Sequence, residues 1–550
     1  MKPAGEVIEV NLQELQALLK QARQEPLGEE DYQKLKAALD ALGYLTELIG
    51  DKDTTISRLR ALLAKPSTEK TSKVLEQAGL EAHPKGSLPP SVTASASAKT
   101  KAGHGRNGAE AYRGAQRIPI SHATLEPGDH CPKCLKGKVY KEKEPGVRIR
   151  VVGQAPLAAR VWELERLRCN LCGDVFEAPA PEGVGEKKYD ESAAAMIGLL
   201  RYGSGIPFYR LAGLEGKLGI PLPPSTQWGI MQETAGVIRP AFEELIRQAA
   251  QGEVFYNDDT SMKILALARA SPPSGGTPKE ASGSRERTGL FTSGIVSTRP
   301  GQRMALFFTG RRHAGENLAQ VLAHRAAGLA PPIQMCDALS RNVPKLPEKL
   351  EMIVGHCLAH GRRHVVDVVP SFPEECRYVL ENLGEVYGYD AQAEKQGLSP
   401  EERLRFHQVH SSPVMERLHA WLQAQFDEKK VEPNSGLGTA IAYLLRHWDR
   451  LTLFLRQAGA PLDTNIVERA LKKSILHRKN SLFYKTPNGA EVGDLFMSLI
   501  HTCELNGANP FDYLTALQRH SAELARDPST WMPWNYDETL RRADATADAG

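Results

Sequence analysis

Apolar residues near the start of the chain recur with the period of a helix. From Leu35 they return at every seventh position, as Leu42, Ile49, Ile56 and Leu63. This heptad seam predicts a helical N-terminal region over 1–65. Gly43 and Gly50 interrupt the seam. A short coiled coil that dimerises and an amphipathic helix packed within its own chain therefore both remain open interpretations.

The pattern changes after this region. Residues 66–120 are rich in Ser, Ala, Gly and Pro and locally rich in Lys and Arg, which predicts a flexible basic linker. Within 121–182, strand-like apolar runs occupy 147–152 and 159–169. Residues 183–250 have the longer helical period. Two short helices followed by a third after Pro224 predict a helix-turn-helix-like DNA-binding region.

Short apolar runs typical of strands begin after residue 250. They lie at 253–260, 262–268, 290–296, 304–310 and 332–337, with a helix at 313–328 and a strand and helix within 345–366. Strands in series followed by alternating strand and helix predict a mixed α/β sheet over 251–500. Residues 270–287 read as a Gly/Ser/Pro loop, about 360–455 as a helical insertion, and 501–550 as a C-terminal region.

Composition excludes several classes of protein. Of the 550 residues, 41% are apolar and 25% charged, which is ordinary for a globular chain of several domains. The net charge is only +3, so a nucleic-acid partner would have to meet local basic segments, at 99–117 and 469–479. No apolar run is long enough for a membrane helix and no signal peptide begins the chain, which predicts a cytoplasmic protein.

Four of the eight cysteines form two CxxC pairs, Cys131 with Cys134 and Cys169 with Cys172. Two such turns supply the tetrahedral thiolate set of a zinc ion, so 121–182 is predicted to be a four-cysteine zinc-binding domain. Four thiolates leave no open position, which makes the zinc structural rather than catalytic. Cys357 and His360 form a second ligand-like pair, for which buried packing is the preferred interpretation because two ligands are too few.

Three carboxylates far apart in the sequence suggest metal-dependent chemistry. Asp258 and Asp259 end one strand, Asp337 ends another, and Glu468 begins a helix with basic residues on its following turns. Acids at strand ends converge at the mouth of a sheet. Such carboxylates hold two Mg²⁺ ions about 3.5–4 Å apart in phosphoryl transfer.

These segments resemble one known family, the bacterial insertion sequence sixty-six transposases of the DDE type. The resemblance covers about 120–535 and is carried by CPKC, LRCNLCGDVFEAPAP, NDDT, HCLAHGRRHVVDV and DTNIVERALKKSILHRKNSLFYKTPNGAEVGDLFMSLIHTCELNGANPFDYL. It implies a ribonuclease-H-like core with the catalytic triad Asp258, Asp337 and Glu468, which would hold two Mg²⁺. The position of Thr260 favours Asp258 over Asp259. Residues near the metal site or the DNA would be Asn465, Arg469, Lys472, Lys473, Arg478 and Lys479.

The resemblance also implies an activity. The protein would bind the ends of its element and catalyse Mg²⁺-dependent DNA cleavage and strand transfer. It would act as at least a dimer on DNA and associate with the nucleoid when bound, and accessory transposition proteins are further candidate partners. Two alternatives remain: a catalytically inactive or domesticated DNA-binding relative, and a zinc-stapled dimeric scaffold protein.

Two departures from the family pattern concern substrate contacts. The family continues G-Y-x-G-Y after its second Asp, where this chain has Ala338, Leu339, Ser340, Arg341 and Asn342. The Trp of the family's C-W-A-H motif is Leu358. The acids themselves are all present.

Overall fold

The computed structural model describes residues 117–142, 147–151, 154–170, 172, 174–181, 187–268, 289–348 and 350–547, with 28, 71, 74 and 110. Nearly all of the predicted helical region 1–65 and of the linker 66–120, and the whole loop at 270–287, lie outside these residues. The chain divides into two compact units, Met1–Pro84 with Val365–Glu385, and Lys85–His364 with Val386–Gly550. Among the described residues of the first unit, Arg377 pairs with Glu374 at 3.1 Å. The central sheet and the candidate site lie in the second unit.

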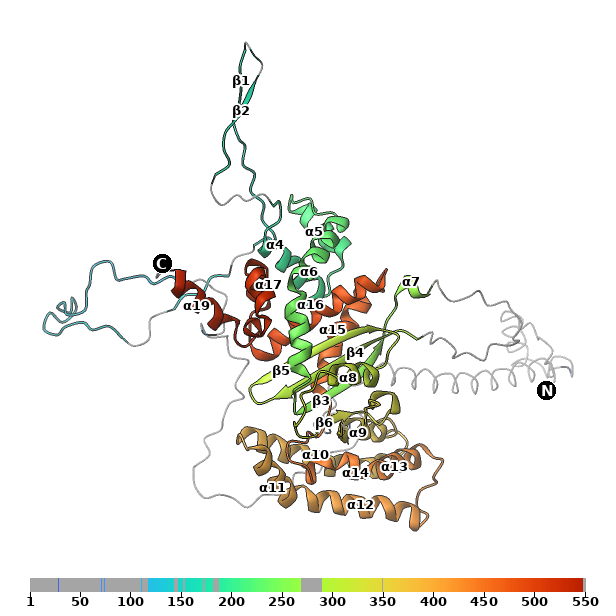
Figure 1. Ribbon diagram of the computed structural model, residues 1–550. Coiled ribbons are helices and arrows are strands. Elements are labelled where there is room, and N and C mark those ends of the chain that lie inside the picture. The colour runs from blue at the N-terminus through green and yellow to red at the C-terminus, as the bar shows by residue number, and fades with distance from the viewer. Residues whose placement is uncertain are drawn as a thin grey trace, which may run out of the picture. The chain divides into compact units, whose positions relative to one another are not determined.

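A five-stranded mixed sheet lies at the centre of the second unit (Figure 1). Its strands are β3 (Val254–Ser261), β4 (Phe291–Arg299), β5 (Gln302–Gly310), β6 (Ile333–Cys336) and β7 (Ile353–His356), in the order β5-β4-β3-β6-β7. The first three run antiparallel, whereas β6 is parallel to β3 and β7 is parallel to β6. The predicted mixed α/β class is confirmed.

The edge strand β5 is covered by the helix α16 (Pro487–Asn506), which runs along it. The side chains of Asp494, Ser498, Thr502 and Asn506 accept hydrogen bonds from the backbone N–H groups of Thr309, Phe307, Ala305 and Arg303, respectively. Every fourth residue of a helix advances about as far as every second residue of a strand. This polar stripe of α16 therefore accepts hydrogen bonds from the backbone N–H groups along β5, which would otherwise be open to pairing with another chain.

Two segments predicted as strands are not strands. Residues 262–268 make a single bridge from Ile264 to Tyr484 and then the short helix α7 (Leu265–Ala268). Met262 and Ile264 pack there with Tyr484 rather than in the sheet. The described part of 147–152 is irregular and exposed. Of 159–169, only β1 (Arg166–Arg168) is a strand, paired antiparallel with β2 (Val175–Glu177).

Along the chain, helices precede, separate and follow the strands of the sheet. Before β3 they are α4 (Glu191–Gly198), the π-helix η2 (Leu199–Gly203), α5 (Phe208–Lys217) and α6 (Pro224–Ala249), and between β5 and β7 they are α8 (Ala314–Leu322) and η3 (Ser340–Asn342). After β7 they are α9 (Leu358–Val366), α10 (Pro373–Lys395), α11 (Pro400–His410), α12 (Ser412–Asp427), α13 (Gly436–Arg446), α14 (Trp448–Leu451) and η4 (Leu453–Leu455). The last are α15 (Asn465–Ser481), α16, α17 (Pro510–Arg519), α18 (Ser521–Arg526), η5 (Pro528–Trp531) and α19 (Tyr536–Ala547).

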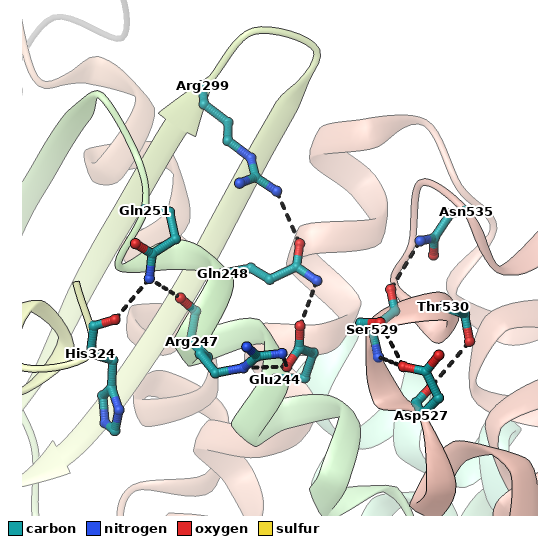
Figure 2. A network of polar contacts seen from close by, with 10 residues as sticks. All are labelled: Glu244, Arg247, Gln248, Gln251, Arg299, His324, Asp527, Ser529, Thr530 and Asn535. Atoms are coloured by element: carbon teal, nitrogen blue, oxygen red, sulfur yellow. Dashed lines mark hydrogen bonds and ion pairs between the residues drawn. The ribbon is translucent and has the colours of Figure 1, made fainter. Parts of the chain in front are cut away.

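The long helix α6 is a core element. It buries Met231, Ile238 and Leu245 and packs against α16 and α17. Figure 2 shows how its end is fixed: Gln248 accepts a hydrogen bond from Arg299 of β4 at 3.0 Å, and Gln251 donates to the carbonyl of His324 at 2.8 Å. The helix-turn-helix interpretation of 183–250 remains a prediction.

No helix in the described ranges is long and apolar enough to cross a lipid bilayer.

Candidate active site

Asp258 lies within β3, and Asp337 directly follows the end of the neighbouring parallel strand β6. Tyr256 of β3 is paired with Met335 of β6, so two residues further along the same register Asp258 meets Asp337. The Oδ1 atom of Asp258 accepts a hydrogen bond from the backbone N–H of Asp259 at 2.8 Å. The pKa of Asp258 is raised from 3.8 to about 6, mainly by burial; the negative charge of Asp337 contributes to this rise, and hydrogen bonds oppose it.

A single amide group joins the two acids. The Nδ2 atom of Asn342 donates to Oδ1 of Asp337 at 2.5 Å and to Oδ1 of Asp258 at 3.3 Å. Asn342 is fully buried at the end of η3. Sequence reasoning missed this residue. Its only signal was that it follows the second Asp, in the segment that departs from the family pattern.

Glu468 reaches the same face of the sheet from α15. In the sheet, Asp258 is opposite Gly294 of β4. A Cβ atom at Gly294 would lie 2.9 Å from Leu471 and 3.3 Å from Val467, both on α15. The missing side chain therefore lets α15 seat directly on the pair to which Asp258 belongs, and Glu468 is in the first turn of that helix.

His360 and Arg363 of α9 lie next to Glu468. The Nε2 atom of His360 is 3.6 Å from Oε1 of Glu468, and an Nη2 atom of Arg363 is 3.7 Å from Oε2. The charge of His360 also acts on Asp258, where it lowers the pKa. Among the described residues, no three His, Cys, Asp or Glu side chains are grouped closely enough to hold one metal ion.

Asp259 points to the opposite side of the sheet from Asp258, as neighbours on a strand do. Its buried carboxylate accepts hydrogen bonds from the Ser293 hydroxyl at 2.7 Å and from Nδ1 of His313 at 2.9 Å. Asn317 of α8 donates to the same hydroxyl at 2.8 Å. This network fastens α8 to β3 and β4, so Asp259 is engaged away from Asp337.

The residues predicted to contact DNA form two groups on α15. Asn465, Arg469, Lys472 and Lys479 are exposed, and their spacing places them along one face of the helix. Arg478 instead donates to the Thr260 hydroxyl at 3.1 Å and to Ser261, where β3 ends. Lys473 pairs with Glu504 of α16 at 2.9 Å.

Each CxxC pair forms a turn of its own. The N–H of Cys131 donates to the carbonyl of Gly137 at 2.8 Å, and the N–H of Gly137 lies 3.4 Å from Sγ of Cys134. The backbone N–H of Gly137, followed by that of Lys136, lowers the pKa of the Cys134 thiol.

In the second pair, the N–H of Cys169 donates to the carbonyl of Asp174 at 2.9 Å and the thiol of Cys172 donates to its carboxylate at 3.3 Å. In the described ranges, which include all four of these cysteines, no three of the thiols are grouped closely enough to hold one metal ion.

Cys357 is buried with its Sγ 3.3 Å from the N–H of Thr464, and burial raises the pKa of its thiol to about 11. It packs with Met335 and Ala359, as the preferred interpretation had it.

Known proteins match most of this region. A sequence model of the family described as "Transposase IS66 family" matches residues 187–492, more than half of the chain. Three relatives are uncharacterized proteins of Sinorhizobium fredii. The protein y4jD is 27% identical over 76% of this chain and 81% of its own length. The protein y4hP is 23% identical over 76% and 75%, and y4qI is 26% identical over 63% and 62%.

Proposed function

Because this chain belongs to the IS66 family of transposases, we propose that it is a DDE transposase that cleaves DNA at the ends of its element and joins the cut end to target DNA. The observation that carries the proposal is the register that sets Asp258 of β3 beside Asp337, at the carboxyl end of β6. Glu468 lies on the helix that covers the same face. Substrates of open α/β sheets bind at the carboxyl ends of the strands.

Asp258, Asp337 and Glu468 would hold magnesium. They are not grouped tightly enough for one ion in the described structure, but each keeps one carboxylate oxygen that accepts no hydrogen bond there. Within the described part of the chain, every hydrogen bond to the two aspartates goes to Oδ1, so each keeps Oδ2 without a partner. Oε1 of Glu468 is buried and accepts no hydrogen bond among the described residues. When bound, two Mg²⁺ ions would activate the attacking oxygen and stabilise the leaving oxygen. We assign the first acid to Asp258 because Asp259 is held on the opposite side of the sheet.

A ribonuclease-H-like core is supported by the strand order. Three antiparallel strands are followed by two that run parallel to the first, and α15 then returns to the middle of the sheet with Glu468. The helices between β7 and α15 would form the insertion predicted at about 360–455.

DNA would bind along the exposed face of α15 formed by Asn465, Arg469, Lys472 and Lys479. The three cations lie in one line with Asn465, whose amide donates to Asp463 at 2.6 Å. Contacts from such cations hold phosphates and position a duplex without reading its sequence. Arg478 and Lys473, by contrast, would act by holding β3 and α16.

A structural zinc ion would be held by Cys131, Cys134, Cys169 and Cys172. The first turn already directs a backbone N–H at the Cys134 sulfur, the kind of hydrogen bond that favours a thiolate ligand. The zinc would tie the two turns together and so order 121–182.

The decisive experiment is strand cleavage of a duplex carrying the element's own end, with Mg²⁺ and any accessory proteins supplied. We expect the wild type to nick this DNA, and Asp258→Asn, Asp337→Asn and Glu468→Gln each to lose on the order of 10²-fold or more in rate. Asp427→Asn, at an exposed acid of α12, is the matched control and should keep its activity. A folded wild type that neither cleaves nor joins the DNA would instead identify an inactive, DNA-binding relative.

A further inference from the structure

Asn342 holds two negatively charged side chains with one NH₂ group. Its Nδ2 has two hydrogens, and the two acceptors within reach are Oδ1 of Asp337 at 2.5 Å and Oδ1 of Asp258 at 3.3 Å. The amide orientation follows from these contacts, because the opposite orientation would direct its carbonyl oxygen at two carboxylates. With this orientation, Oδ1 of Asn342 is buried and has no partner among the described residues.

Two other buried amides fix the position of Asn342 through its backbone carbonyl. Its backbone carbonyl accepts hydrogen bonds from Nδ2 of Asn257 and from Nε2 of Gln334, each at 2.7 Å. Gln334 also donates to Oδ1 of Asn257 at 2.7 Å. Asn257 directly precedes Asp258 on β3, and Gln334 lies on β6, so the residue that bridges the acids is itself fixed to both of their strands.

The short helix η3 that ends at Asn342 is fixed from a further side by α8. A Cβ atom at Gly315 would lie 2.7 Å from the carbonyl oxygens of Arg341 and Val343, which flank Asn342. The backbone of α8 therefore rests on the backbone of η3. This leaves Asn342 little freedom to move toward or away from the acids.

We propose that Asn342 is a positioning residue that fixes the carboxylates of Asp258 and Asp337 so that the Oδ2 atom of each faces the metal site. The inference rests on the proposed function and deepens it. Backbone N–H groups supply the remaining contacts to the same oxygens, from Asp259 at 2.8 Å and from Leu339 at 3.2 Å. Donors that hold one oxygen of a ligating carboxylate orient the other and tune the site.

The test is the affinity for Mn²⁺ alone, measured from the electron paramagnetic resonance signal of the free ion. The variant Asn342→Leu removes the donors at similar volume while keeping the backbone carbonyl that Asn257 and Gln334 contact. Asn342→Ser is the second variant, to be used if the Leu variant does not fold by circular dichroism. Asn506→Leu is the matched control, because its amide makes comparable hydrogen bonds to Arg303 and Thr502 at the far edge of the sheet.

We expect Asn342→Leu to bind Mn²⁺ about 10- to 100-fold more weakly than the wild type, and Asn506→Leu to bind it as the wild type does. A folded Asn342 variant that binds Mn²⁺ within twofold of the wild type, while Asp337→Asn loses binding, would overturn the role of Asn342 and leave the proposed function standing. If the wild type binds no more Mn²⁺ than Asp337→Asn does, the metal site itself fails, and this inference fails with it.

Discussion

The Nδ2 atom of Asn342 lies 2.5 Å from Oδ1 of Asp337, although Asn342 belongs to a helical turn that lies outside the strands of the sheet. The contact turns the segment after the second acid into part of the site. The geometry of the site therefore depends on backbone packing around η3 as much as on the acids themselves.

The first prediction concerns that packing. Gly315→Ala would force a Cβ atom to within 2.7 Å of two backbone carbonyl oxygens of η3, and backbone cannot yield as a flexible side chain can. We expect a loss of about 1–3 kcal/mol in the free energy of unfolding, measured by urea titration, together with weaker Mn²⁺ binding. Gly213→Ala on α5, where a Cβ meets nothing within 4 Å, is the control and should be neutral or slightly stabilising. Unchanged stability in Gly315→Ala would contradict the close contact between α8 and η3.

A second prediction concerns pH and the stripe of α16 that covers β5. Burial raises the pKa of Asp494 from 3.8 to about 7, although hydrogen bonds from Thr309 lower it. The folded state then binds more protons than the unfolded state between these two values. Asp494 therefore costs stability progressively as the pH rises from 3.8 to about 7, by at most about 1.4 kcal/mol per pH unit.

The variant Asp494→Asn removes this titration and keeps an acceptor for the N–H of Thr309. Urea unfolding at several pH values should show the Asn variant gaining on the wild type up to about pH 7, with a constant difference above it. A difference independent of pH would mean that Asp494 titrates normally in the folded protein.

His477 gives a third prediction, of opposite sign. Both ring nitrogens are buried without a hydrogen-bond partner among the described residues, and the ring stacks on Tyr484 with centroids 4.6 Å apart. Burial, followed by the charge of Arg201, lowers the pKa of His477 from 6.5 to about 3. The folded protein therefore keeps a neutral ring, and its stability falls as the pH drops below 6.5.

His477→Phe keeps the stacked ring and removes the group that must be protonated on unfolding. We expect equal or slightly higher stability at neutral pH and a shallower decline in acid, followed by thermal melting between pH 7 and pH 4. His419→Phe, at a half-buried ring that lies tilted against Trp448, serves as the control. Acid sensitivity identical to that of the wild type would show that His477 is solvated in the folded state.

The zinc proposal predicts metal content. Wild-type protein purified without chelator should contain about one zinc per chain, measured by mass spectrometry of the metal. Cys134→Ser and Cys172→Ser should each lose it, whereas Cys376→Ser, at a buried thiol outside the pairs, should retain it. Zinc well below one per chain in the wild type would leave the two turns as separate hairpins.

The sequence was most informative where one local pattern determines the result. The β-branched and aromatic runs around Asp258 and Asp337 became adjacent strands, and the apolar period of α15 carried Glu468 to their face. The segment at 262–268 has the same apolar character, but its partner is Tyr484, far along the chain, so pattern alone misassigned it. Asn342 could not be recognised because its function comes from three-dimensional contacts with Asn257, Gln334 and α8. The opposed directions of Asp258 and Asp259 likewise became clear only through Ser293 and His313.

Asp258 is proposed to bind the metal used in DNA cleavage. Cleavage of element-end DNA by Asp258→Cys, compared in Mg²⁺ and in Mn²⁺, tests this role. Mg²⁺ is a hard ion that disfavours sulfur ligands, whereas Mn²⁺ tolerates them better. We expect the variant to be inactive in Mg²⁺. Its cleavage rate relative to that of the wild type should be at least about tenfold higher in Mn²⁺ than in Mg²⁺. Equal activity of the variant in both metals, whether lost or retained, would contradict this role of Asp258.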